Sequence, residues 1–282
     1  MSKIAIVTDS TSDIPPELVE KNNITSVPLS VIFKDATYLD DGKEITIDDF
    51  YKKLKSSQDL PTTSQPTPKD FVETYTSLLK DHDSILSVHI SKKMSGTINS
   101  VELAKQQMPD ADVEIFDSEL VHMPLGFLVL EAARLSGEGK SMDEIVEGLR
   151  AMKARIKVLF VPSTLEYLKK GGRIGRAKGL IASLLEIKPI LTITEGEVSQ
   201  FKTTRRWNQA KIELVNSMES MIKDPKKMTV SIGDSDAAED AEEMRQRIEE
   251  RFSPKKIIRV NIGAVVGTHL GPGGIGITFY ED

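Results

Sequence analysis

Short apolar runs alternate with amphipathic segments along almost the whole chain, and this alternation strongly constrains the fold. The apolar runs lie at residues 4–8, 85–90, 113–117, 158–161, 228–233, 256–263 and 275–280, and helical patterns separate most of them. Such alternation predicts an α/β fold with largely parallel sheets, because a helix is the usual connection between two parallel strands. With 282 residues, of which 39% are hydrophobic, the chain is long enough for two α/β domains.

Several helix starts carry a capping pattern. Pro15 and Pro16 predict one start, because proline is tolerated where the backbone amide has no helical partner. Thr46 is expected to cap a helix that ends near residue 57, and Thr67 with Asp70 has the spacing of a capping box. Further helices are expected from Ser95 to about residue 108 and over 124–135, 141–156, 164–170, 205–223 and 236–252. We expect residues 26–33 to be extended, 58–68 and 171–179 to form loops, and 189–202 to form a strand pair.

The long helix at 141–156 is the best position for a domain boundary. We therefore expect an N-terminal α/β domain over residues 1–150 and a C-terminal α/β domain over residues 151–282. Ligands commonly bind in clefts at domain interfaces, so the sequence predicts a ligand cleft between these two domains.

The composition argues against several classes of protein. A formal net charge of −6 disfavours a nucleic-acid-binding protein, which needs a basic face. The absence of cysteine excludes disulfides, thiolate metal sites and cysteine catalysis, and the four histidines (His82, His89, His122 and His269) lack paired metal-ligand spacing. The first residues resemble a strand rather than a signal peptide, and no apolar run reaches membrane-spanning length, so we expect a soluble cytoplasmic protein.

Three polar stretches are candidates for parts of a binding site. TDSTSD (8–13) follows the first strand, so Asp9 and Ser10 lie where ligands gather at the carboxyl end of a sheet strand. TTSQPT (62–67) and SGT (95–97) precede helix starts, where free amides can bind an anion; Ser95 is a natural N-cap and Gly96 permits close approach of a ligand. The simpler interpretations are a turn with an N-cap, a polar linker and a capping serine.

A fourth stretch, GTHLGPGGIG (267–276), belongs to a region that is crowded with glycine. The glycines at 263, 267, 271, 273, 274 and 276 indicate positive φ angles or close backbone packing. The stretch matches neither a Walker A loop nor a G-x-G-x-x-G dinucleotide pattern. His269 is either a ligand-binding group or a structural hydrogen-bonding residue. A hydrolase triad of Ser95, His269 and Asp9 is a further alternative, although Ser95 does not lie in a G-x-S-x-G elbow.

The order of these motifs resembles the DegV family. The resemblance rests on TDSTSD at 8–13, TSQPT at 63–67, SGT at 95–97, GGRIG at 171–175 and GTHLGPGGIG at 267–276, and it spans nearly the whole chain. It implies a fold of two α/β domains with a lipid-binding cleft between them. It also implies a bacterial fatty-acid-binding protein that serves phospholipid synthesis as the binding subunit of a fatty-acid kinase. Such a subunit presents a bound fatty acid to a separate ATP-using subunit, which forms the acyl phosphate.

The same resemblance implies a set of ligand-binding residues. Thr63, Ser95 and His269 would hold the fatty-acid carboxylate, and Gly96 and Thr97 would lend backbone amides near it. The implied ligand is a long-chain fatty acid such as palmitate, stearate or oleate, with no cofactor, no metal and no catalytic residue. Hydroxyls and an imidazole suit this ligand, because a buried carboxylate must be hydrogen-bonded.

A local excess of positive charge surrounds the GGRIG motif. The basic residues are Lys169, Lys170, Arg173, Arg176 and Lys178, with no acidic residue among positions 169–178. The resemblance implies that Arg173 takes part in interaction with the kinase or in phosphoryl transfer. The segment is either a solvated face or a docking patch for an acidic partner, a phosphate or, transiently, an anionic membrane.

Two other functions remain open from the sequence alone. A stand-alone esterase or phosphotransferase using Ser95 or His269 as nucleophile would turn over substrate without a partner. A purely regulatory protein would bind another amphipathic acid and would not deliver it to a kinase. A fatty-acid carrier differs from the first by showing no turnover in isolation.

Overall fold

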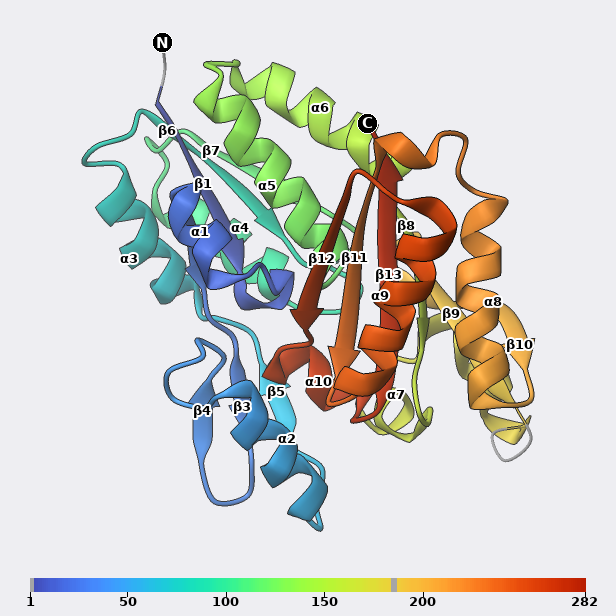
Figure 1. Cartoon of the computed structure of the whole chain (residues 1–282). Helices are drawn as coiled ribbons and strands as arrows, with labels where there is room; N and C mark the ends of the chain where they lie inside the picture. The colour runs from blue at the N-terminus through green and yellow to red at the C-terminus, as the bar shows by residue number, and fades with distance from the viewer. Residues whose placement is uncertain (1–2, 184–186) are drawn as a thin grey trace. The chain divides into compact units, whose positions relative to one another are not determined.

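The computed structural model describes residues 3–183 and 187–282, which form two compact units (Figure 1). The first unit comprises Met1–Ile45 and Thr63–Ala154, and the second comprises Thr46–Thr62 and Arg155–Asp282. Relative to the expected division at residue 150, segment 46–62 belongs to the second unit rather than the first. The physical reason is the packing of Phe50 and Tyr51, which are buried, and the Tyr51 hydroxyl donates to the carbonyl of Ile262 at 2.9 Å.

The first unit is built on a parallel sheet, as the alternation of strands and helices predicted. Its strands are β1 (Ile4–Asp9), β2 (Ile24–Val27), β6 (Ser84–His89) and β7 (Val113–Asp117), in the order β2-β1-β6-β7. β1 and β6 are buried along their whole length, which requires cover on both faces of the sheet.

Helices provide that cover. The helices of this unit are α1 (Pro16–Lys21), α3 (Pro68–Leu78), α4 (Thr97–Gln107), α5 (Met123–Gly137) and α6 (Met142–Arg155), with a 3-10 turn, η1 (Ser10–Ser12). Phe71 and Tyr75 of α3 pack with Val101 of α4 against Val7 and Ile85 of the sheet. α5 contacts β1 and β6, and Figure 1 shows it on the side of the sheet away from α3. The expected capping box of α3 is confirmed, since Thr67 and Asp70 bond each other's backbone amides.

A small second sheet extends from the first unit. It contains β3 (Ser30–Ile32), β4 (Thr37–Leu39) and β5 (Thr62–Ser64) in the order β4-β3-β5. The sequence predicted the extended run that includes β3, but it missed β4 and treated β5 as part of a loop. Each of these strands has three residues, which is too short for an alternating pattern to be recognised.

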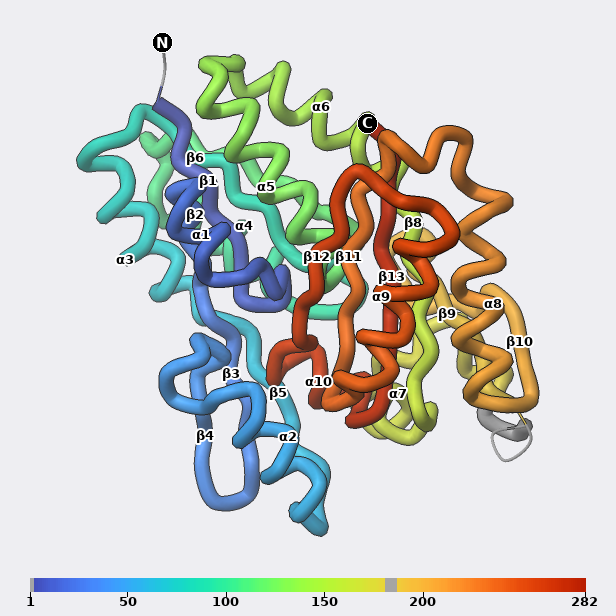
Figure 2. The backbone as a smooth tube through the Cα atoms, viewed as in Figure 1, coloured from blue at the N-terminus to red at the C-terminus, as the bar shows by residue number. Residues whose placement is uncertain are grey.

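The second unit contains a six-stranded mixed sheet. Its strands are β8 (Lys157–Val161), β9 (Lys188–Thr194), β10 (Glu197–Thr204), β11 (Met228–Ser235), β12 (Lys256–Asn261) and β13 (Gly274–Glu281), in the order β10-β9-β8-β13-β11-β12. Only β11 and β12 pair in parallel, so the expectation of a largely parallel sheet is wrong for this unit. β9 and β10 are joined by a two-residue turn with positive φ at Glu195 and Gly196, which forces an antiparallel hairpin. Figure 2 shows β13 running between β8 and β11.

The described residues of the second unit form five helices. They are α2 (Ile47–Ser56), α7 (Glu166–Lys170), α8 (Trp207–Glu219), α9 (Ala238–Phe252) and α10 (Ala264–Leu270), with 3-10 segments η2 (Gly175–Ser183) and η3 (Pro225–Lys227). α8 and α9 pack through Leu214, Met218, Met244 and Ile248 onto the sheet to form the core of this unit. The expected N-cap of α2 is confirmed, because the Thr46 hydroxyl accepts the amide of Asp49 at 3.1 Å.

The glycine-rich stretch 267–276 belongs to two different elements, since its first four residues complete α10 and its last three open β13. Within residues 3–183 and 187–282, no helix is long and apolar enough to cross a membrane.

Candidate functional site

The order of strands in the first unit predicts where a ligand can approach its sheet. From β1 the chain passes first to β2 on one side and later to β6 on the other side. Loops at the carboxyl ends of two such strands diverge, and ligands of parallel α/β sheets bind at this point. Asp9 ends β1 and His89 ends β6, so the segments that follow them, TDSTSD and SGT, lie at this edge.

The SGT motif forms the start of α4. Gly96 rather than Ser95 is the N-cap, without a side-chain capping bond, so the expectation that Ser95 caps this helix is wrong. The Ser95 hydroxyl lies 2.9 Å from the hydroxyl of Thr97 and accepts the Thr97 amide at 3.3 Å. The Ser95 hydroxyl thus lies beside the first backbone amides of α4, and this geometry suits an incoming anion.

Gln65 connects the TSQPT motif to the SGT motif. Its side-chain amide donates to the carbonyl of Gly96 and to the hydroxyl of Ser100, both at 2.9 Å. A β-carbon at position 96 would lie 2.0 Å from the Gln65 side-chain oxygen, so glycine is needed for this contact. The structure thereby brings the segment that carries Thr63 to the start of α4. Sequence reasoning did not single out Gln65, because its partners lie more than thirty residues away.

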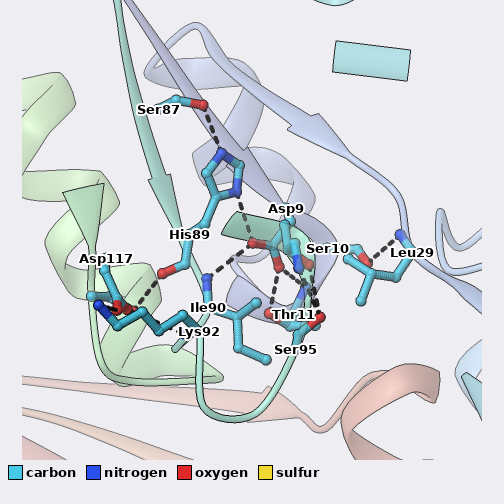
Figure 3. Close-up of polar contacts among 12 residues, drawn as sticks. Asp9, Ser10, Thr11, Leu29, Ser87, His89, Ile90, Lys92, Ser95 and Asp117 are labelled. Carbon is cyan, nitrogen blue, oxygen red and sulfur yellow. Dashed lines mark hydrogen bonds and ion pairs between the residues drawn. The ribbon is translucent and has the colours of Figure 1, made fainter. Parts of the chain in front are cut away.

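Asp9 lies at the centre of a buried polar network (Figure 3). One carboxylate oxygen accepts the amide of Ile90 at 3.1 Å and lies 2.9 Å from Nδ1 of His89. The other accepts both the amide, at 3.1 Å, and the hydroxyl of Thr11. His89 continues the network, with Nε2 2.6 Å from the hydroxyl of Ser87. No local pattern distinguishes His89 in the sequence, since its partner Asp9 is eighty residues away.

Ser10 also has a defined partner. Its hydroxyl accepts the amide of Leu29 at 3.1 Å, which ties the end of β1 to the segment between β2 and β3 (Figure 3). Asp9 and Ser10 thus hold neighbouring segments in place at the carboxyl edge of the sheet.

His269 lies in the last turn of α10, in the second unit. Gly271 ends this helix with φ of 79°, a conformation that favours glycine. A β-carbon at Gly171 of the GGRIG motif would lie 2.3 Å from Nδ1 of His269, so the ring packs directly against that backbone. Burial, and secondarily the nearby Arg173 guanidinium, lower the pKa of His269 to about 4. The imidazole is therefore neutral at pH 7.

The basic segment around Arg173 is less positive than its sequence indicates. Lys170 pairs with Glu166 at 2.6 Å, and Arg176 pairs with Glu195 at 2.6 Å and Glu197 at 3.2 Å. Arg173 is exposed and donates to the carbonyl of Gly171 at 2.7 Å.

The predicted site residues thus fall into two groups. In the first unit, Ser95, Gly96 and Thr97 adjoin one another, and Gln65 links them to the strand that carries Thr63. In the second unit, His269 and Arg173 adjoin through the GGRIG backbone. Over the described ranges 3–183 and 187–282, no group of three histidine, aspartate or glutamate side chains is placed to hold a metal ion.

Two α/β units, one with hydroxyls and helix amides at the carboxyl edge of a parallel sheet and one with a partly buried histidine on a short helix, are typical of a ligand-binding protein. The model of the DegV family matches residues 3–282, so the chain belongs to the DegV family. A DegV domain-containing protein of Caldanaerobacter subterraneus is 34% identical over 281 residues, covering all of both chains.

Solved structures agree with this assignment. A fatty-acid-binding DegV family protein from Thermus thermophilus shares 35% identity and superposes with a TM-score of 0.94 over the whole of both chains. A stearic acid-binding protein from Eubacterium ventriosum shares 27% identity with a TM-score of 0.88, covering 100% of this chain and 98% of that one. The expected family and the expected two-unit α/β fold are confirmed.

Proposed function

We propose that this protein binds a long-chain fatty acid and that Thr63, Ser95, Gly96, Thr97 and His269 hold the carboxylate. The observation that carries the proposal is the start of α4, where hydroxyls and helix amides lie at the carboxyl edge of a parallel sheet. The fatty-acid ligands of the Thermus and Eubacterium relatives support the choice of ligand.

The chemistry of the donors suits a carboxylate. A carboxylate that leaves water needs hydrogen-bond donors, and the proposed donors are the hydroxyls of Ser95 and Thr63, the first amides of α4 and the imidazole of His269. A neutral imidazole retains one N–H, so His269 can donate without carrying a charge. A bound carboxylate would also favour the protonated ring and so raise the pKa of His269 from about 4.

The acyl tail would supply most of the affinity. Each methylene removed from water contributes about 0.8 kcal/mol before the entropy costs of binding are subtracted. A chain of stearate length therefore binds mainly through its tail, while the polar donors decide which head group is accepted.

We further propose that the protein presents the carboxylate to a separate ATP-using fatty-acid kinase, which forms the acyl phosphate. Arg173 is exposed next to the glycine-rich backbone of residues 171–172, so a partner can reach its guanidinium. In this proposal Arg173 contacts the kinase or the transferred phosphoryl group. The protein alone should show no turnover of fatty acid and ATP.

The contacts of Ser95 favour binding over catalysis. A serine nucleophile needs a neighbouring general base, usually an imidazole or a carboxylate. Within the first unit, the Ser95 hydroxyl instead contacts the hydroxyl and the amide of Thr97. These hydroxyl and amide groups suit the binding of a carboxylate oxygen better than the activation of a serine nucleophile.

The proposal is tested by identifying what the purified protein carries. Its mass is measured under native conditions, and any bound lipid is extracted and identified. We expect the wild type to carry a stoichiometric long-chain fatty acid. The control variant Ser64→Ala, which changes an exposed serine, should carry it as well. The double variant Ser95→Ala/His269→Ala should not. Full lipid occupancy of the double variant would refute the assignment of the head-group residues. An empty wild type that also fails to take up added palmitate would refute fatty-acid binding.

A kinase assay tests the second half of the proposal. Acyl phosphate should form only when the loaded protein, ATP and a fatty-acid kinase subunit are combined, and Arg173→Ala should reduce its formation without releasing the lipid. Turnover by the protein alone would instead support the esterase or phosphotransferase alternative.

A further inference from the structure

A chain of four buried side chains crosses the first unit from α3 to the end of β1. The Tyr75 hydroxyl lies 2.7 Å from the Ser87 hydroxyl, which lies 2.6 Å from Nε2 of His89, and Nδ1 of His89 lies 2.9 Å from the Asp9 carboxylate. Tyr75, Ser87, His89 and Asp9 are each 0% exposed. The head-group residues proposed above include none of these side chains.

The donors and acceptors assign the protons of this chain. If Tyr75 donates to Ser87, then Ser87 donates to Nε2 of His89 and the Nδ1–H donates to Asp9, so every proton meets an acceptor. The opposite direction would place a proton on Nε2 of His89 and make Ser87 donate to the Tyr75 hydroxyl, whose own proton would then need another acceptor. Burial raises the pKa of Tyr75, which keeps that proton in place. In this arrangement Nδ1–H of His89 donates to Asp9.

Asp9 offers no donor to an anionic ligand, because its side-chain oxygens accept hydrogen bonds from neighbouring groups. Its oxygens are instead used by donors from two segments, namely Thr11 after β1, and His89 and Ile90 at the end of β6. The Ile90 contact is the one that bears on the ligand site. Ile90 immediately precedes the segment that leads to the SGT motif.

The segment from Ile90 to Ser95 is short and internally bonded. The carbonyl of Ser91 accepts the amide of Met94 at 2.9 Å and the amide of Ser95 at 3.1 Å. The amide of Ser91 in turn donates to the carbonyl of Leu120 at 2.9 Å. Because these backbone hydrogen bonds restrain the turn from residue 91 to residue 95, a displacement of Ile90 also displaces Ser95.

We propose that Asp9 and His89 are positioning residues for the fatty-acid carboxylate. By fixing Ile90 and the turn that follows it, this pair sets the position of Ser95, Gly96 and Thr97 and so the preference of the site for a carboxylate over an uncharged head group. The inference rests on the proposed function, since it names two further residues on which that same site depends.

The test compares two ligands of equal length, palmitate and hexadecanol, in the full-length protein stripped of lipid. Asp9→Asn replaces one carboxylate oxygen by an NH2 group, so the side chain can no longer accept from Thr11 with one oxygen and from both Ile90 and His89 with the other, and the network that anchors the turn is disrupted. We expect Asp9→Asn to weaken palmitate binding about tenfold or more, the factor that corresponds to one hydrogen bond to a charged group, and to change hexadecanol binding less than about threefold. Ser136→Ala is the matched control, because Ser136 bonds the carbonyl of Ile4 at the opposite end of β1.

Two variants of His89 keep the test decisive if Asp9→Asn does not fold. His89→Asn retains an N–H that can donate to Asp9, whereas His89→Leu removes it. We expect His89→Asn to keep the preference for palmitate and His89→Leu to lose it. The tautomer gives an independent readout: imidazole nitrogen NMR shifts should show Nδ1–H in the wild type.

The outcomes separate the inference from the function beneath it. If the wild type binds palmitate no better than hexadecanol, the proposed head-group site fails. If the wild type prefers palmitate and both Asp9→Asn and His89→Leu keep that preference, the positioning inference alone is overturned. Equal losses for the two ligands would also overturn it, because a purely structural defect does not distinguish head groups.

Discussion

The two units treat an ionisable group in opposite ways. In the first unit, Asp9 is fully buried and receives hydrogen bonds from Thr11, Ile90 and His89. In the second, burial and the Arg173 guanidinium lower the pKa of His269 to about 4, so the ring is neutral. The hydrogen bonds to Asp9 hold its neighbours in one arrangement. His269, in contrast, can change its protonation state when a charged ligand binds.

This difference suggests a division of labour in ligand binding. In the proposed site, a rigid edge with hydroxyls and amides would select a carboxylate by geometry, because its donors are fixed before the ligand arrives. A neutral imidazole adds a donor whose strength increases if a bound carboxylate draws a proton to it. Substitutions in the hydrogen-bond network of the first unit should therefore lower the free energy of unfolding most. The contribution of the second unit to stability should depend on pH.

The largest expected effect is the removal of the Asp9 carboxylate. Asp9→Ala leaves the buried donors of Thr11, Ile90 and His89 without their acceptor, and we expect a loss of roughly 3–5 kcal/mol in the free energy of unfolding. Urea denaturation measures this loss. His269→Ala should cost clearly less, and equal losses in the two variants would contradict the comparison.

A glycine at the end of α10 should be the next most sensitive position. Gly271→Ala combines a positive φ of 79° with a β-carbon 2.3 Å from the ring of Tyr167, so we expect a loss of about 2–4 kcal/mol. Gly172→Ala is the matched control, since its φ is 72° but nothing lies within 4 Å, and it should cost only about 1 kcal/mol. Thermal unfolding of the two variants measures the difference. Similar losses would show that the contact between Gly271 and the Tyr167 ring is not sterically tight.

The pH dependence of stability should come partly from His269. Its pKa is lowered from 6.5 to about 4, so the unfolded chain binds the proton more readily. Its contribution is therefore complete above pH 6.5 and is lost as the pH falls towards about 4, by roughly 2 kcal/mol after allowance for partial exposure. Denaturation of the wild type and of His269→Gln at pH 7 and pH 4.5 isolates this contribution. If the two proteins lose stability in parallel, the ring is not buried as described.

The smallest expected effect concerns Arg173. Replacing its guanidinium in Arg173→Gln removes a repulsion that is secondary to burial, so the pKa of His269 should rise modestly, with an energy below about 1 kcal/mol. Arg173→Lys keeps the charge and is the control. Proton NMR titration of the histidine ring measures the pKa. An unchanged pKa in Arg173→Gln would show that the Arg173 guanidinium has no electrostatic effect on His269.

The sequence predicted the first unit better than the second. The alternation of strands and helices implies parallel pairing, and β1, β6 and β7 follow it. In the second unit the Glu195–Gly196 turn closes a hairpin and β13 returns after a short helix, so most pairs are antiparallel. The helix α10 was missed because Gly267 lowers helix propensity, yet packing of Gly267 against Phe50 and Tyr51 outweighs that preference.

Residues of the candidate site could be selected from the sequence only where they lie together in a short, recognisable motif. Ser95, Gly96 and Thr97 are contiguous, and His269 lies in a conspicuous glycine-rich stretch. Gln65 and His89 carry no local signal, because their hydrogen-bond partners lie far away along the chain. Groups that position a site through distant contacts become visible only in the fold.

The most direct test of the proposed function is a double-mutant cycle on palmitate affinity with Ser95→Ala, His269→Ala and the double variant. If residues of both units hold one carboxylate, the two substitutions should be coupled by about 1 kcal/mol or more, and the coupling should vanish with hexadecanol. Additive effects, or equal coupling with both ligands, would contradict a carboxylate site to which both residues contribute.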